Sequence, residues 1–204
     1  MRWLRLYLRS RRIPLALLTA TVTSTLVWAL WLAFSDRPVI GTRFVSLTVT
    51  LAVTAFAATL AGADDELDHT AATSWPVRRA GHLLLTATAI IAPLLLSTVT
   101  HARFAPLAVV VRDTAGILGL TALGAALVGA AWSWLAPLVW TLVTVVPLLD
   151  PDAGPHMRVV VWSIEPAGST AAAACAGVLA VTGVLAYAVR GCPRRPAAAT
   201  VADG

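Results

Sequence analysis

The densest group of residues with chemical potential lies in the segment 62–82, GADDELDHTAATSWPVRRAGH. Four carboxylates precede a histidine there: Asp64, Asp65, Glu66, Asp68 and His69. Asp65 and His69 are four residues apart, so on a helix they would share one face and could ligate a metal. The same acids are also favoured at a solvated helix start, where they complement the macrodipole. We favour the helix start, and we predict that this chain binds no metal or other cofactor.

Groups of residues typical of enzymes are not found elsewhere in the sequence. There is no GxSxG or HExxH motif, and no Ser, His and Asp set that the pattern brings together. All fifteen basic residues are Arg, so the chain has no Lys for a phosphate-binding loop or a Schiff base. The sequence therefore predicts a protein that is not an enzyme and has no ATPase motif of its own.

The composition places the chain in the membrane class. Of its 204 residues 58% are hydrophobic and 12% are charged, and the mean hydropathy is +0.81. A soluble domain has about 25% charged residues, which this chain lacks for a water-exposed surface. The net charge of +5 comes from Arg residues beside apolar segments, which indicates contact with membrane lipid rather than nucleic acid.

Apolar segments predict an all-α integral membrane protein with six spans in one domain, 13–190. A span needs about 20 mostly apolar residues. The expected spans are 13–34, 39–62, 81–100, 114–131, 133–149 and 170–190. The run 107–149 is ambiguous, because it could also form one span and a re-entrant segment. We favour two spans with a turn at Trp132-Ser133-Trp134, since Trp prefers the membrane interface.

The two ends of the chain are expected in the cytoplasm. Residues 1–12, MRWLRLYLRSRR, carry Arg at spacings of three and four, which predicts an interfacial amphipathic helix or a simple positive anchor. The following apolar run is longer than a secretory signal core and lacks a cleavage site, so we interpret it as a retained span. With this orientation ten Arg lie inside and five outside, and 191–204 is a cytoplasmic flexible tail.

The 62–82 segment is then interpreted as a structured elbow between the second and third spans. Acids lead a short helix near 64–73, and the Trp75-Pro76 pair interrupts it. Pro76 is well placed to start the next helix, which carries Arg78 and Arg79 in its first turn. The predicted elbow is longer than a tight turn between two spans requires.

Two further features concern the outer side and the helix interfaces. Arg112 and Asp113 are placed at the outer edge of the fourth span, with the Arg extended to the interface, so no ionisable group is expected in mid-span. The apolar stretch MRVVVWSI within 150–168 is too short to span and predicts an interfacial or re-entrant helix. Small residues predict close helix packing at Gly119, Ala122, Ala126 and Gly177.

This organisation resembles the membrane subunits of ABC transporters of the type-2 permease (exporter) class. The segment DELDHTAATSWPVRRAGHLL is also similar to one in small actinobacterial permease-like proteins, where a Leu-Glu-Arg-Thr pattern precedes a Pro and an Arg-rich span start. Leu67, Asp68, His69 and Thr70 stand at those positions, and Asp68 and His69 depart from the pattern. The similarity covers the chain as topology and about twenty residues as sequence.

The resemblance implies partners and a mechanism. The elbow would dock on a cytoplasmic ABC ATPase subunit, which binds the ATP, through Asp64, Asp65, Glu66, Asp68, His69, Arg78 and Arg79. A second permease subunit would complete a homo- or heterodimer in the plasma membrane, and the pair would export a lipophilic or peptide cargo. The alternatives are a non-transporting membrane anchor, immunity or assembly protein, and an ion- or proton-coupled carrier or intramembrane enzyme, which the absence of mid-span ionisable residues disfavours.

Overall fold

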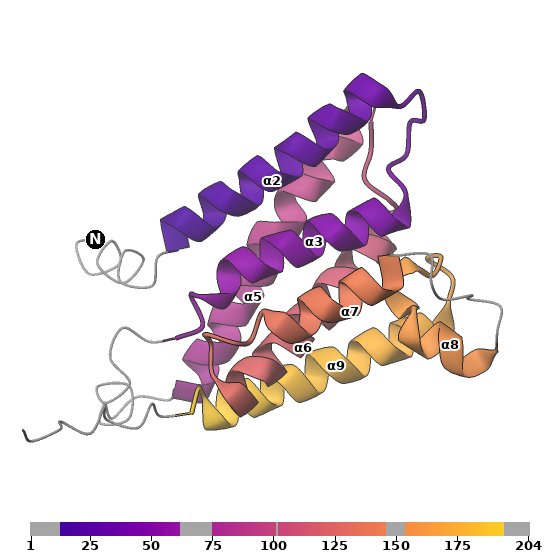
Figure 1. Ribbon diagram of the computed structural model, residues 1–204. Coiled ribbons are helices and arrows are strands. Elements are labelled where there is room, and N and C mark those ends of the chain that lie inside the picture. The colour runs from indigo at the N-terminus through magenta and orange to yellow at the C-terminus, as the bar shows by residue number, and fades with distance from the viewer. Residues whose placement is uncertain (1–12, 62–74, 101, 146–153, 194–204) are drawn as a thin grey trace, which may run out of the picture.

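A computed structural model of the chain describes residues 13–61, 75–100, 102–145 and 154–193. Those residues form helices, with one isolated bridge between Val39 and Arg103 and no strand within the described ranges (Figure 1). The predicted interfacial helix 1–12, the elbow acids and most of the tail 191–204 lie outside them. The structure therefore tests the predicted spans but not the predicted elbow helix.

Four helices in the described part of the chain are long and apolar enough to cross a membrane. They are α2 (Ile13–Phe34), α5 (Trp75–Leu96, continued by η1, Ser97–Val99), α6 (Leu107–Val128) and α9 (Thr170–Arg190). Two apolar helices are shorter, α3 (Thr42–Ala57) and α7 (Leu135–Val145). The fold is thus that of an all-α membrane protein with four candidate spans, where the sequence predicted six.

The second predicted span, 39–62, is shorter because its first residues have other backbone partners. Pro38 and Ile40 pair with Arg103: the Arg103 N–H donates to the Pro38 carbonyl at 2.9 Å, and the Ile40 N–H donates to the Arg103 carbonyl at 2.8 Å. These bonds hold 38–40 extended, so α3 begins only at Thr42. At its other end the Thr59 N–H bonds the Phe56 carbonyl, which closes the helix after Ala57.

The fourth predicted span is shifted along the chain, which corrects the position of the charged pair. The prediction was 114–131, but α6 begins at Leu107 and contains Arg112 and Asp113 in its second turn. Helix α6 can include Arg112 and Asp113 because both side chains have partners inside the protein. The helices that correspond to the fifth and third predicted spans begin at Leu135 and Trp75 rather than at 133 and 81. The chain turns at 130–134, as the Trp132-Ser133-Trp134 stretch predicts.

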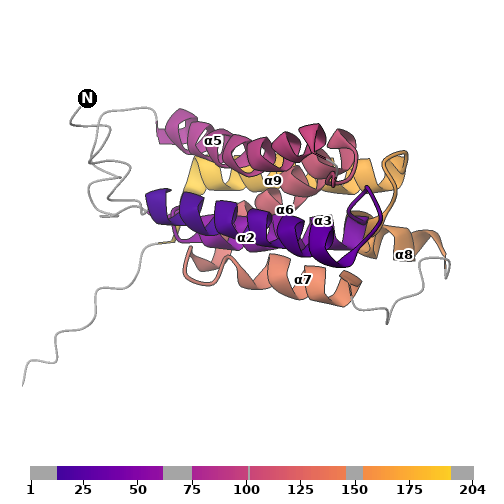
Figure 2. The same cartoon turned by 90° about the horizontal axis from the view of Figure 1, so that it is seen from above.

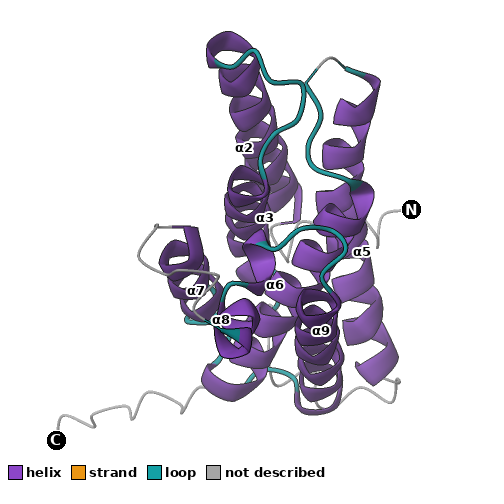
Figure 3. Ribbon diagram, turned by 90° about the vertical axis from the view of Figure 1, so that its right-hand side faces the viewer, coloured by secondary structure: helices purple, strands orange, loops and turns teal. Residues whose placement is uncertain are grey.

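Helix α6 occupies the centre of the bundle. It contacts α3, α5, α7 and α9, and its contact with α9 is the most extensive between any two described helices (Figure 3). Helix α2 lies at the periphery, against α3 and α5 (Figures 1 and 2). Its buried face is narrow, consisting of Ala16, Ala20 and Ser24, and its leucines are exposed, as expected of a helix that faces lipid.

Two short helices cover one end of the bundle. Helix α8 (Pro155–Val160) and the 3-10 helix η3 (Trp162–Ile164) lie beside the start of α9, and neither is long enough to span (Figure 1). They contain the MRVVVWSI stretch, for which a short interfacial or re-entrant helix was expected. Trp162 is buried against Gly116 of α6, whose missing side chain leaves room for the indole ring. This packing ties the 162–164 turn to the central helix.

Candidate functional site

The charged pair of α6 is buried in the protein. The side chain of Asp113 is fully buried and that of Arg112 is 7% exposed. The Arg112 Nε donates to the Asp113 Oδ1 at 3.0 Å. The expectation that Arg112 extends to the membrane interface was therefore wrong, because the guanidinium turns inward to an anion and to free carbonyls.

Those carbonyls belong to the segment at and after the end of η3. Arg112 Nη1 donates to the Pro166 carbonyl at 3.1 Å, and Nη2 donates to those of Glu165 at 2.9 Å and Ser163 at 3.4 Å. The last carbonyls of a helix have no partner within it, so a cation there satisfies groups that would otherwise be buried unpaired. One side chain of α6 thus fixes the 163–166 segment, residues that follow it by about fifty positions.

Several buried polar atoms within the described ranges, including one oxygen of Asp113, have no hydrogen-bond partner. Asp113 Oδ2, Thr114 Oγ1 and Trp162 Nε1 are buried and make no hydrogen bond to the described residues, and Ser46 Oγ of α3 does not either. A buried acceptor of this kind costs about 1–3 kcal/mol when unpaired, and more when charged. Chemically, Asp113 Oδ2 can accept a proton or a hydrogen bond from a bound polar group. No three His, Cys, Asp or Glu side chains cluster within the described ranges.

A row of hydroxyls links the same end of the bundle to its interior. Thr42 Oγ1 of α3 donates to the Ile164 carbonyl at 3.1 Å, and Ser163 Oγ lies 3.4 Å from Thr144 Oγ1 of α7. Further along the two helices, Thr50 and Thr141 share a buried hydrogen bond of 2.7 Å. Helices α3 and α7 therefore contact each other and η3 through hydroxyl groups.

The opposite end of the bundle holds the two points where the elbow segment leaves and returns. The chain leaves after Ala61 and returns at Trp75. Before it leaves, the Tyr187 hydroxyl of α9 donates to the Leu60 carbonyl at 2.6 Å, and Thr59 Oγ1 lies 3.0 Å from His82 Nε2 of α5. After it returns, Arg79 Nη1 donates to the Ala188 carbonyl at 3.4 Å. Both flanks of the elbow therefore contact α9, whose carboxyl end lies on this side of the bundle (Figure 1).

Of the residues predicted to contact an ATPase, two are described. Arg78 is exposed and lies over the Trp75 ring, with its Cζ 5.7 Å from the ring centroid. Arg79 is half-buried, packed on Gly191, which has a positive φ of 67° and no Cβ to obstruct the guanidinium. Asp64, Asp65, Glu66, Asp68 and His69 lie outside the described residues. Arg79 therefore makes its contacts within the protein, with Ala188 and Gly191, whereas Arg78 is exposed next to the elbow segment.

The predicted small-residue positions separate into two groups. Ala122 and Ala126 are buried, and Gly119 lies against the backbone of α9 at Leu179 and Ala180. Gly177 is exposed and has open space where a side chain would extend, and the glycine of α9 at the crossing is Gly183 instead. A side chain on Gly183 would overlap the Gly119 carbonyl. Sequence spacing could have pointed to Gly183, because Gly183 follows Ala176 by about two helical turns.

Comparison with models of protein families gives no match for this chain. Comparisons with curated proteins and with solved structures give no match either.

Proposed function

We propose that this chain is the membrane subunit of an ABC-type exporter, in which a separate ATPase acts on the elbow between the second and third spans. One observation carries the proposal: both flanks of the elbow are hydrogen-bonded to the carboxyl end of α9. Leu60 binds Tyr187 before the elbow, and Arg79 binds Ala188 after it. A force applied to the elbow would therefore reach α9.

The packing of α9 supports transmission to the far end of the bundle. Helix α9 contacts α6 at Gly119 and Gly183, where the two backbones touch. Because no side chains lie between them, there is little there that could rearrange to absorb a movement of one helix. Helix α6 in turn holds the 163–166 segment through Arg112. A shift of α9 against α6 would thus alter the contacts of this outer segment, as an alternating opening of the two ends requires.

The proposal includes six passes with both termini in the cytoplasm. Successive helices run in alternating directions along the bundle in the order α2, α3, α5, α6, α7 and α9 (Figures 1 and 2). Helix α3 has 16 residues, which is about 24 Å at 1.5 Å per residue, and a bilayer core is about 30 Å thick. The proposal treats α3 and α7 as short crossings whose ends are completed by the adjoining turns.

The test uses the intact chain with an affinity tag, purified from membranes in mild detergent. In the triple variant Asp64→Lys, Asp65→Lys, Glu66→Lys the charge of the elbow is reversed. The matched control is Asp36→Lys, an exposed acid at the opposite end. We expect ATP hydrolysis to co-purify with wild type and control and to be lost from the triple variant. Absence of co-purifying ATPase activity from all three would overturn the permease assignment in favour of a non-transporting partner protein.

A second candidate is a proton-coupled carrier, favoured by the buried carboxylate inside α6. Asp113 Oδ2 has no partner among the described residues, and intramembrane carboxylates often serve as proton sites. In proteoliposomes with an internal pH dye, this candidate predicts proton movement down an imposed gradient that Asp113→Asn abolishes. If wild type and variant leave the internal pH equally unchanged, the carrier is excluded.

A further inference from the structure

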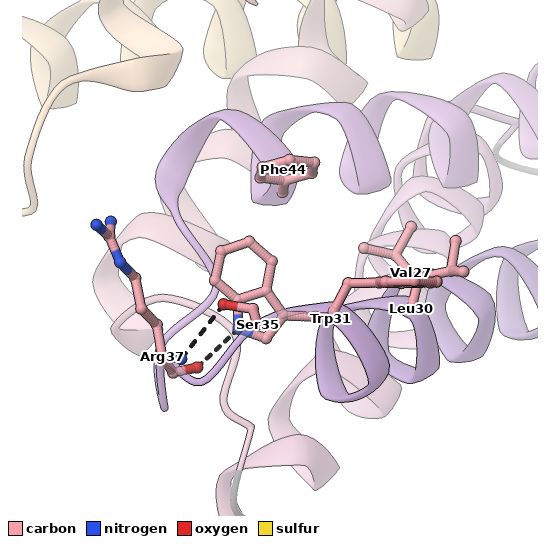
Figure 4. Close-up of a pocket in the computed structure, with 7 residues that line it drawn as sticks. Val27, Leu30, Trp31, Ser35, Arg37 and Phe44 are labelled. Atoms are coloured by element: carbon pink, nitrogen blue, oxygen red, sulfur yellow. Dashed lines mark hydrogen bonds between the residues drawn. The ribbon is translucent and has the colours of Figure 1, made fainter.

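An apolar groove of about 530 Å³ lies between the last turns of α2 and the start of α3. It is lined by Val27, Leu30, Trp31, Phe34, Ser35, Arg37 and Phe44. Figure 4 shows Val27, Leu30 and Trp31 of α2, followed by Ser35 and Arg37 from the loop after the helix, with Phe44 of α3 opposite them. The row from Val27 to Phe34 covers about 10 Å of helix axis, and Leu30, Phe34 and Phe44 are exposed. The groove therefore opens to whatever surrounds the bundle.

The walls of the groove are held in place by internal contacts. The Trp31 ring packs edge-on against Phe44, with centroids 5.3 Å apart and an interplanar angle of 66°. Trp31 Nε1 donates to the Arg37 carbonyl at 2.8 Å, and the Arg37 N–H donates to Ser35 Oγ at 3.3 Å (Figure 4). With the indole N–H already bonded, Trp31 presents only its apolar ring to the groove. The Arg37 guanidinium is the charged group at its rim.

The position of Arg37 matches the depth of a lipid phosphate. It lies just beyond the end of the candidate span α2, where Arg side chains reach the headgroup layer. The only ion pair within the described ranges joins Arg112 and Asp113, so Arg37 is not paired with its exposed neighbour Asp36. An apolar groove along the span with a cation at its end has the distribution of charge that an anionic phospholipid complements.

We propose that this groove binds one anionic phospholipid, with an acyl chain along Val27–Phe34 and the phosphate on Arg37. The proposal rests on the candidate span α2 and not on the transport function. A second copy of the chain is the less suitable occupant, because the residues that line the groove include a cation and no acid, so the same groove on another copy has no acid to pair with Arg37. A phosphate oxygen accepts charge-assisted hydrogen bonds from a guanidinium with good geometry.

The experiment is native mass spectrometry of the delipidated full chain titrated with palmitoyl-oleoyl phosphatidylglycerol or the matching phosphatidylcholine. Arg37→Gln removes the cation, and Arg103→Gln is the control, an exposed Arg at the same end that does not line the groove. Leu30→Trp fills the groove, and Leu26→Trp is its control, an exposed Leu on the same helix outside the lining.

We expect Arg37→Gln to weaken phosphatidylglycerol binding about tenfold, because a hydrogen bond to a charged group is lost. Arg37→Lys should restore part of this affinity, Leu30→Trp should weaken binding similarly, and both controls should bind as wild type does. Equal binding of the two lipids, or phosphatidylglycerol binding that Arg37→Gln and Leu30→Trp leave unchanged, would overturn the proposal. A dimer that Leu30→Trp dissociates while lipid binding persists would overturn it in favour of a second copy.

Discussion

The Tyr187 hydroxyl donates a hydrogen bond of 2.6 Å to the carbonyl oxygen of Leu60, across 127 positions of the chain. Tyr187 lies in the last turn of α9, and Leu60 directly precedes the segment that leaves the bundle between α3 and α5. Both groups are buried, so the bond forms where water does not compete. It makes the carboxyl end of α9 the anchor of the proposed elbow.

Replacing Tyr187 with Phe should therefore loosen this anchor. We expect a loss of about 1 kcal/mol or more in the free energy of unfolding, since the buried hydrogen bond to Leu60 is removed and the ring is kept. Thermal unfolding of the purified protein in detergent measures it. The control is Thr182→Val, whose exposed hydroxyl bonds only to carbonyls of its own helix. Equal melting temperatures for Tyr187→Phe and wild type would contradict the prediction.

The buried pair of α6 should show strong non-additivity. Arg112→Leu leaves Asp113 buried without its cation, which should cost about 3–5 kcal/mol. The double variant Arg112→Leu, Asp113→Leu removes both charges and should be more stable than Arg112→Leu alone. Chemical unfolding of wild type, both single variants and the double variant completes a double-mutant cycle. A double variant that is no more stable than Arg112→Leu would show that the carbonyl contacts of Arg112, and not the ion pair, dominate.

The crossing of α6 and α9 should reject any side chain at Gly183. Gly183→Leu must separate two backbones that touch, and the expected destabilisation is about 1–3 kcal/mol or more. The exposed Gly177 on the same helix has open space around it, so Gly177→Leu is the matched control. Fluorescence-detected gel filtration after a heat step compares the two. A Gly177→Leu variant as unstable as Gly183→Leu would place Gly177 at a contact outside the chain.

Labelling from outside the cell should separate four passes from six. In a chain with Cys175 and Cys192 replaced by Ser, a cysteine at Ala131 marks the α6–α7 turn and one at Ser74 marks the elbow. Six passes with cytoplasmic termini place both inside, and Asp36→Cys outside. A membrane-impermeant maleimide should then label only Asp36→Cys in intact cells. Labelling at Ser74 would mean that α3 does not cross the membrane.

The local sequence pattern was sufficient to predict where the first and last long helices begin and end. The ranges 13–34 and 170–190 coincide with α2 and α9, because each is an uninterrupted apolar run whose length alone predicts a helix. The membrane class followed from composition in the same way. In contrast, the start of α3 depends on backbone hydrogen bonds to Arg103, and no pattern within 39–62 signals a partner so distant in the sequence.

The charged pair on α6, Arg112 and Asp113, also separates what the sequence predicts from what the tertiary structure decides. The sequence alone favours placing Arg112-Asp113 at the outer edge of a span, because two ionisable groups are costly inside a membrane. Only the tertiary structure decides otherwise: the carbonyls of Ser163, Glu165 and Pro166 come to the guanidinium and satisfy it, so the helix can begin earlier and keep the pair buried. Composition and apolar length thus determined the class of protein, whereas contacts distant in sequence decided which polar groups it buries.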